Sequence, residues 1–105
     1  MSADHLFRSL ADPTRRAIFE HLCREGEQTV GALTGTAGVS QPAVSRHLAM
    51  LKRAGLVSDH PAGRRVHYRA EPAALAPLGD WTREMSAFWD RRLDRLGELM
   101  TRMDQ

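Results

Sequence analysis

The chain has 105 residues, a length that fits one domain. Hydrophobic residues make up 42% of it and charged residues 27%, which is the balance of a globular domain rather than of a disordered chain. No apolar run approaches the roughly 18 residues of a membrane span, and the first residues lack the basic and then apolar profile of a signal peptide. A single cysteine, Cys23, excludes an internal disulfide. We therefore expect a cytoplasmic, single-domain protein (residues 1–105) that does not associate with membranes and is not a large enzyme.

The net charge of +2 is unevenly distributed along the chain. Residues 40–70 carry six basic side chains against one acidic side chain, whereas residues 1–39 have a net charge of −1 and residues 71–105 of −2. A basic middle between weakly acidic flanks is typical of a local face that binds a polyanion. A solvated charged surface gives the same pattern, so charge alone leaves both interpretations open.

Two helices are predicted at the start of the chain. Leu6, Phe7 and Leu10 share one face of a short first helix, and Asp12-Pro13 is an N-cap followed by proline in the first turn of a second helix. The second helix ends at Gly26. Its apolar stripe consists of Ala17, Ile18, Phe19, Leu22 and Cys23. Because Cys23 belongs to the stripe, a buried structural thiol is favoured over a redox sensor.

A helix-turn-helix is predicted over about residues 29–54. Thr29 caps a short third helix that ends by Gly38, and Ser40-Gln41-Pro42 begins a fourth helix that ends at Gly55. The inner face of the fourth helix consists of Val44, Leu48 and Leu51. Two short helices joined by a glycine-containing turn present the second helix to the DNA major groove.

A β-hairpin and a long helix follow. Residues 56–60 and 65–69 are short β-prone runs around a turn at 61–64, which predicts a wing over about residues 56–70. Helical spacing returns over about residues 78–103, a predicted helix of roughly 39 Å. The fold class is therefore mainly α (α+β): a winged helix-turn-helix with helical arms at both ends.

The long helix carries more apolar surface than so small a core can cover, which indicates a protein–protein interface. We expect a homodimer with twofold symmetry in which this helix and the first helix pack against their mates. The predicted dimerisation residues are Leu6, Trp81, Met85, Phe88, Trp89, Leu93, Leu96 and Met100.

The outward face of the fourth helix has the chemistry of base and phosphate recognition. Arginine bonds guanine in a bidentate manner, glutamine does the same to adenine, and serines together with helix N-terminal N–H groups suit phosphates. A thin loop with two arginines reaches the minor groove or its flanking phosphates. The predicted DNA-binding residues are Ser40, Gln41, Pro42, Ser45, Arg46, His47, Arg64 and Arg65.

Two segments resemble the ArsR/SmtB family of bacterial transcriptional regulators: Leu10–Arg16 (LADPTRR) and Val39–Leu48 (VSQPAVSRHL). The similarity extends over about residues 4–103 and includes Leu51-Lys52 and Ala54–Val57. The resemblance implies homodimeric repressors that leave operator DNA when a signal arrives. It assigns base and phosphate contacts to Ser40, Gln41, Ser45, Arg46 and His47.

The chain departs from the metal-sensing members of that family. Its third helix lacks the Cys-x-Cys pair of one type, and no histidine follows His67, whereas another type has Asp and His ligands on the last helix. His60 and His67 flank the hairpin tip and could oppose each other, but no evident set of three or four zinc ligands appears. We therefore expect no metal and no cofactor, and the resemblance is best to metal-independent members.

Three alternatives to a simple DNA-binding repressor arise from the same sequence. A protein-interaction module would use the aromatic last helix to dock another polypeptide, and a redox-responsive repressor would act through Cys23. An enzyme is not expected, because Ser45 and His47 lie two apart on a helix and point in different directions. The inducing signal stays open, which leaves room for a small-molecule effector.

Overall fold

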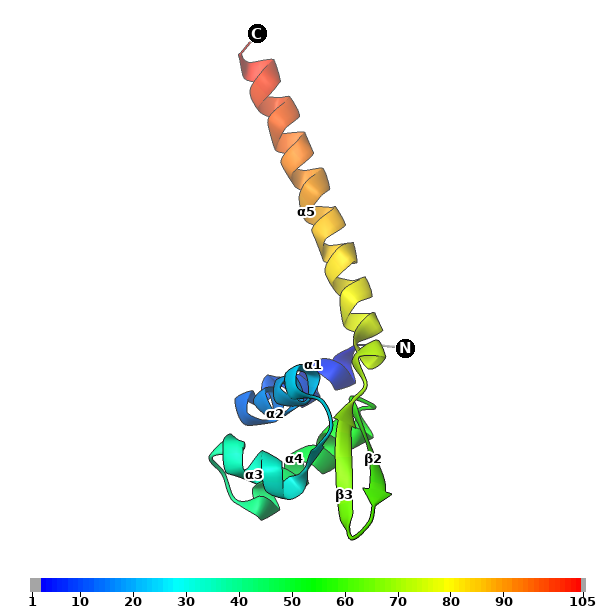
Figure 1. The fold of residues 1–105 in the computed structure, drawn as a ribbon. Coiled ribbons are helices and arrows are strands. Elements are labelled where there is room, and N and C mark those ends of the chain that lie inside the picture. Colours follow the sequence, from blue (N-terminus) through cyan, green and yellow to red (C-terminus); the bar gives the residue numbers. More distant parts are fainter. Residues whose placement is uncertain (1–2, 105) are drawn as a thin grey trace.

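The computed structural model describes residues 3–104 as a small body from which one long helix projects (Figure 1). The elements in chain order are α1 (Asp4–Ala11), α2 (Pro13–Glu25), β1 (Gln28–Thr29), α3 (Val30–Ala37), α4 (Gln41–Arg53), β2 (Val57–Ala62), β3 (Arg65–Ala70), the 3-10 helix η1 (Pro72–Leu75) and α5 (Ala76–Met103). The overall extents of 74 × 27 × 21 Å reflect the projection of α5. This order confirms the predicted winged helix-turn-helix.

The predicted N-caps explain where α2, α3 and α4 begin. The side chains of Asp12, Thr29 and Ser40 each accept a hydrogen bond from the backbone N–H three residues further on, at 2.9, 3.2 and 3.3 Å. These bonds satisfy N–H groups that have no partner within their own helix. Gly38 ends α3 with a φ of 70°, a left-handed conformation that glycine adopts without steric cost and that turns the chain into α4.

The sheet differs from the predicted hairpin in two respects. The two-residue strand β1 pairs with β3, so the sheet has three strands in the order β1-β3-β2. The hairpin also pairs as far as Ala62 with Arg65, because Gly63 has a φ of 67° and permits a two-residue turn in place of the predicted four-residue one. His60 lies opposite His67, as the sequence allowed.

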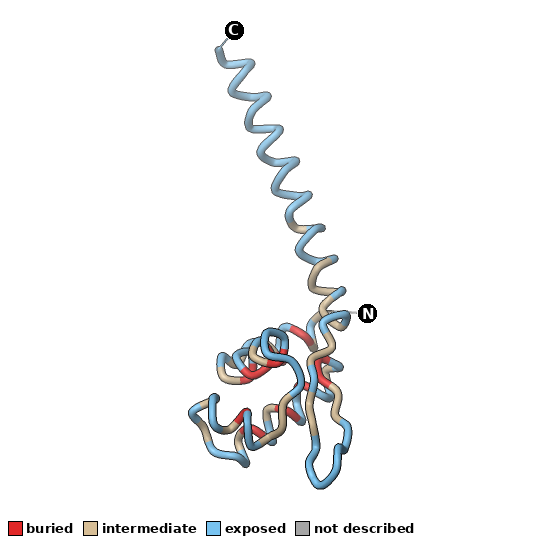
Figure 2. Tube along the Cα trace, viewed as in Figure 1, coloured by how far each residue is buried: buried red, intermediate tan, exposed pale blue. Residues whose placement is uncertain are grey.

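The hydrophobic core lies between α1–α4 and the start of β2 (Figure 2). Val44, Leu48 and Leu51 are completely buried, which confirms the predicted inner face of α4. The other buried hydrophobic residues of the core are Leu6, Ile18, Phe19, Leu22, Leu33, Leu56 and Val57. Burial of this cluster fixes the orientation of α4 relative to α2 and α3.

Two predictions about α1 and α2 are wrong. Leu6 is only 1% exposed and belongs to the core of the body, so it is unavailable to a dimer face, whereas the adjacent Phe7 is 41% exposed. Cys23 is exposed instead of buried, as is Ala17. Periodicity identifies the apolar face of a helix. It does not show which residues of that face a neighbouring element buries and which stay exposed.

Helix α5 begins two residues earlier than predicted and none of its residues is buried. Its 28 residues correspond to about 42 Å of helix. Within residues 3–104, no helix is both long and apolar enough to cross a membrane.

Candidate DNA interface

The outward face of α4 is open to solvent along its first two turns. Gln41, Pro42, Ser45 and Arg46 are all exposed, and Ser40 is exposed at the N-cap. Arg46 makes no salt bridge with any of the described residues, so its guanidinium is free to bond a base or a phosphate. The structure therefore leaves accessible five of the six residues that the sequence predicted on this helix and its cap.

His47, the sixth, is half-buried and faces α2. Its Nδ1 atom lies 3.5 Å from the Nη1 atom of Arg15. The neutral ring can accept a hydrogen bond from this guanidinium only through an unprotonated Nδ1, which places the imidazole proton on Nε2. His47 is thus turned further toward the body than the sequence prediction of an outward-facing side chain.

Arg15 is a buried side chain that sequence reasoning missed. It is only 8% exposed and joins the end of α1 to α4. Its guanidinium donates to the carbonyl oxygens of Arg8 and Ser9 and, at 3.3 Å, to the sulfur of Met50. No carboxylate among the described residues lies within salt-bridge distance of Arg15. The carbonyl groups at the C-terminus of α1, where the helix dipole is negative, offset its charge instead.

A sequence signal for Arg15 was present. Arg15 precedes Ile18, Phe19 and Leu22 by three, four and seven residues, which is the spacing of one helix face. A charged residue within such a face indicates a buried, hydrogen-bonded group.

Asp12 lies close to this network at the N-terminus of α2. The pKa of its carboxyl is lowered chiefly because the carboxylate accepts a hydrogen bond from the backbone N–H of Arg15. Partial desolvation opposes the shift, and electrostatic interactions with the side chains of His47 and Arg15 add to it. Asp12 is therefore ionised at neutral pH, where it can act as a helix cap.

The wing presents its arginines at the tip. Arg64 and Arg65 are exposed at and beside the two-residue turn, and neither forms a salt bridge within the described chain. The helix-turn-helix and the hairpin lie at the end of the molecule opposite the free end of α5 (Figure 1). The predicted groups on α4 and on the wing are thus brought to the same end of the molecule.

Other basic residues of the segment 40–70 are engaged with acids near the base of the wing. Lys52 forms a 2.9 Å salt bridge with Asp59, which raises the pKa of the lysine. Glu71 accepts hydrogen bonds from Ser58 at 2.7 Å and Arg69 at 3.2 Å, and these bonds lower its pKa. Within residues 40–70, the basic side chains that form no salt bridge are therefore Arg46, Arg53, Arg64 and Arg65.

His60 and His67 stack with their ring centroids 5.9 Å apart. Both face Glu27, at 3.2 Å from His60 Nε2 and 3.6 Å from His67 Nδ1. These contacts link Glu27, which precedes β1, to both strands of the hairpin. Across residues 3–104, histidine, cysteine and acidic side chains form no group of three or more that could hold a metal ion.

Helix α5 presents a long stripe of uncovered apolar side chains. Its aromatic residues Trp81, Phe88 and Trp89 are 45%, 49% and 64% exposed. Trp81 packs edge-to-face on Phe7 of α1 with ring centroids 5.0 Å apart, which joins the two terminal helices into one surface. Other predicted dimerisation residues that are exposed are Leu93, Leu96 and Met100, whereas Met85 is half-buried. Leu99 and Met103, which the prediction omitted, are also exposed.

Comparison with known proteins identifies the family of the chain. A helix-turn-helix domain family matches residues 10–60. The HTH-type transcriptional regulator Rv2034 of Mycobacterium tuberculosis is 44% identical over 94% of this chain and 89% of its own length. The ArsR-like transcriptional regulator from Rhodococcus sp. RHA1 has a similar structure, with a TM-score of 0.77, 33% identity and coverage of 91% of this chain and 90% of its own. The chain belongs to the ArsR/SmtB family.

A further relative in this family is the transcriptional repressor SdpR of Bacillus subtilis, which is 33% identical over 74% of this chain and 86% of its own length. Family membership makes the chain a DNA-binding transcriptional regulator and confirms that it is not an enzyme.

Proposed function

We propose that the protein is a homodimeric repressor that binds an inverted-repeat operator. The observation that carries this proposal is the separation of two surfaces on one chain: unpaired polar and cationic groups on α4 and the wing, and an uncovered apolar stripe on α5. A symmetric pair of chains joined through α5 presents two α4 helices to successive major grooves, roughly 34–36 Å apart.

The individual DNA contacts follow from side-chain chemistry. Arg46 pairs with guanine O6 and N7, and Gln41 with adenine N6 and N7. The hydroxyl groups of Ser40 and Ser45 and the backbone N–H of Gln41 donate to phosphate oxygens, and Pro42 packs against the DNA backbone. Arg64 and Arg65 enter the minor groove or neutralise its flanking phosphates, and His47 offers its Nε2–H.

A metal-independent signal fits this chain better than a metal. Helix α3 contains no thiol, and α5 contains no histidine. A redox signal through Cys23 is disfavoured because desolvation raises the pKa of the thiol, whereas sensor thiols have a lowered pKa. An organic effector is therefore the simplest signal.

Selection of duplexes from a random pool by the full chain, followed by light scattering of the complex, tests this function. We expect enriched inverted repeats bound by two chains, with log affinity falling by about 0.9 per phosphate contact against log salt. Replacing Arg64 and Arg65 together by alanine should weaken binding to all duplexes and flatten the salt dependence, whereas Arg102→Ala on α5 should not. A monomer that enriches no duplex would favour the alternative of a protein-interaction module.

A further inference from the structure

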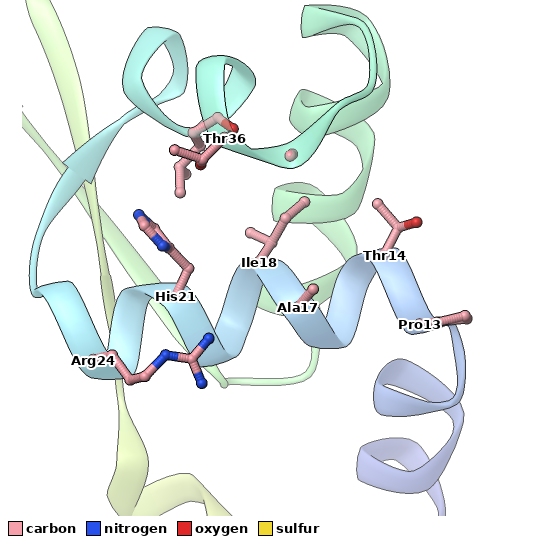
Figure 3. A pocket seen from close by; sticks show the side chains of 9 residues that line it. Pro13, Thr14, Ala17, Ile18, His21, Arg24 and Thr36 are labelled. Atoms are coloured by element: carbon pink, nitrogen blue, oxygen red, sulfur yellow. Dashed lines mark hydrogen bonds between the residues drawn. The ribbon is translucent and has the colours of Figure 1, made fainter.

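A cavity of about 370 Å³ lies between α2 and α3 (Figure 3). Its α2 wall runs from Pro13 to Arg24, a distance of about 16 Å along the helix. Its α3 wall includes Leu33, Thr36 and Ala37. Small-molecule sites in proteins typically have volumes from about 300 Å³ upward, so the cavity is large enough for a compact ligand.

The two ends of the cavity differ in chemistry. Pro13, Ala17 and Ile18 give α2 an apolar wall toward its N-terminus, and Leu33 adds to it from α3. His21 and Arg24 lie toward the C-terminus of α2 (Figure 3). This arrangement matches a molecule with an apolar body and an anionic group at one end.

The cationic end has unused hydrogen-bonding capacity. The side chains of His21 and Arg24 form no hydrogen bond or salt bridge within residues 3–104. Glu20 stands one helical turn before Arg24, a spacing that often supports an ion pair, yet no salt bridge joins them. A carboxylate bound there would receive a bidentate pair of N–H groups from Arg24.

We propose that this cavity is an effector site for a small aromatic or aliphatic carboxylate. The regulatory part of the proposal rests on the proposed function, whereas ligand binding does not. Thr36 and Ala37 form the last turn of α3, immediately before Gly38 and α4. A ligand that bridges α2 and α3 therefore contacts the element that positions the recognition helix, and its binding is coupled to DNA binding in both directions.

The probe for this site is 1-naphthoate, with the uncharged 1-naphthalenemethanol as its matched partner. In titrations of the full chain followed by NMR, we expect naphthoate to shift the signals of Ile18, His21, Leu33 and Ala37. Arg24→Gln should weaken naphthoate at least about tenfold, the worth of a hydrogen bond to a charged group, and leave the alcohol unchanged. Arg102→Gln at the end of α5 is the charge-matched control and should change neither affinity.

A second variant tests the cavity itself. Ala17 is exposed on the apolar wall, so Ala17→Leu fills the space without disturbing the core and should abolish binding of both compounds. The proposed site would be wrong if naphthoate shifted only the signals of other residues. It would also be wrong if Arg24→Gln left the naphthoate affinity unchanged.

The coupling is measured separately on the selected operator duplex. Saturating naphthoate should change operator affinity at least about fivefold in the unmodified chain and not in Ala17→Leu. Binding of naphthoate without any change in operator affinity would refute the effector role. Loss of all DNA binding with intact naphthoate binding would refute the proposed function and leave the ligand site standing.

Discussion

The body and the projecting helix α5 differ in how they are stabilised. In residues 3–75, hydrophobic side chains from four helices and a strand cover one another, and Val44, Leu48 and Leu51 have no exposed surface. In α5 the helical pattern is equally regular, but no residue is buried and Trp89 is 64% exposed. The same amphipathic pattern thus builds an internal core in one region and leaves an uncovered apolar stripe in the other, because only the helices of the body have neighbours that cover their apolar faces.

The largest expected effect is a loss of stability on truncating a core residue of the body. Leu48→Ala should lower the free energy of unfolding by about 2–5 kcal/mol, because it removes buried methyl groups and leaves a cavity. Urea unfolding followed by the amide signals of α4 measures it. Leu93→Ala makes the same chemical change on α5 and should leave these signals unchanged at equal urea. Equal losses in the two variants would mean that α5 packs on the body in solution.

The next largest expected effect is a loss of dimer affinity on truncating an aromatic residue of the proposed interface. Trp89→Ala should weaken dimerisation by about 2–4 kcal/mol, the range of an aromatic interface anchor, while the body stays folded. Light scattering across a concentration series measures the dimer, and Arg95→Ala, an exposed charged residue on α5, is the control. A Trp89→Ala chain that dimerises like the unmodified one would place the interface elsewhere.

A smaller effect concerns DNA recognition by the body. Arg46→Ala should cost about 1–3 kcal/mol of operator affinity and relax the base preference at one position of each half-site. Arg53→Ala, at the exposed end of α4, should lower affinity for all sequences more evenly. Affinity measurements on operators that carry each of the four bases at the affected position distinguish the two variants. An unchanged base preference in Arg46→Ala would contradict the base contact.

The smallest effect is a dependence of stability on pH. Because the pKa of Asp12 is lower in the folded state than its ordinary value of 3.8, ionised Asp12 stabilises the fold above that value. This contribution is lost as the pH falls through the lowered pKa. Acid unfolding of Asp12→Ala should therefore show a shallower pH dependence than the unmodified chain, with Asp90→Ala on α5 as the control. Parallel acid-unfolding curves for Asp12→Ala and the unmodified chain would show that the cap contributes nothing.

Prediction from the sequence succeeded where the signal was local. The caps Asp12, Thr29 and Ser40 and the buried face of α4 follow from residue types at fixed spacings. It failed where a neighbour decides the outcome. Strand β1 has only two residues and exists because β3 lies beside it, and Leu6 and Cys23 were assigned to the wrong environments because periodicity does not identify the covering element.

The sequence by itself determined the five α-helices, the hairpin, their order and the family, since capping, turn chemistry and periodicity act over a few neighbouring residues. Only the tertiary structure decided which apolar surfaces are covered. It buried Arg15 against the end of α1, turned His47 toward α2, and opened a cavity beside His21 and Arg24. These outcomes depend on contacts between residues distant in the chain, whose energies no local pattern contains.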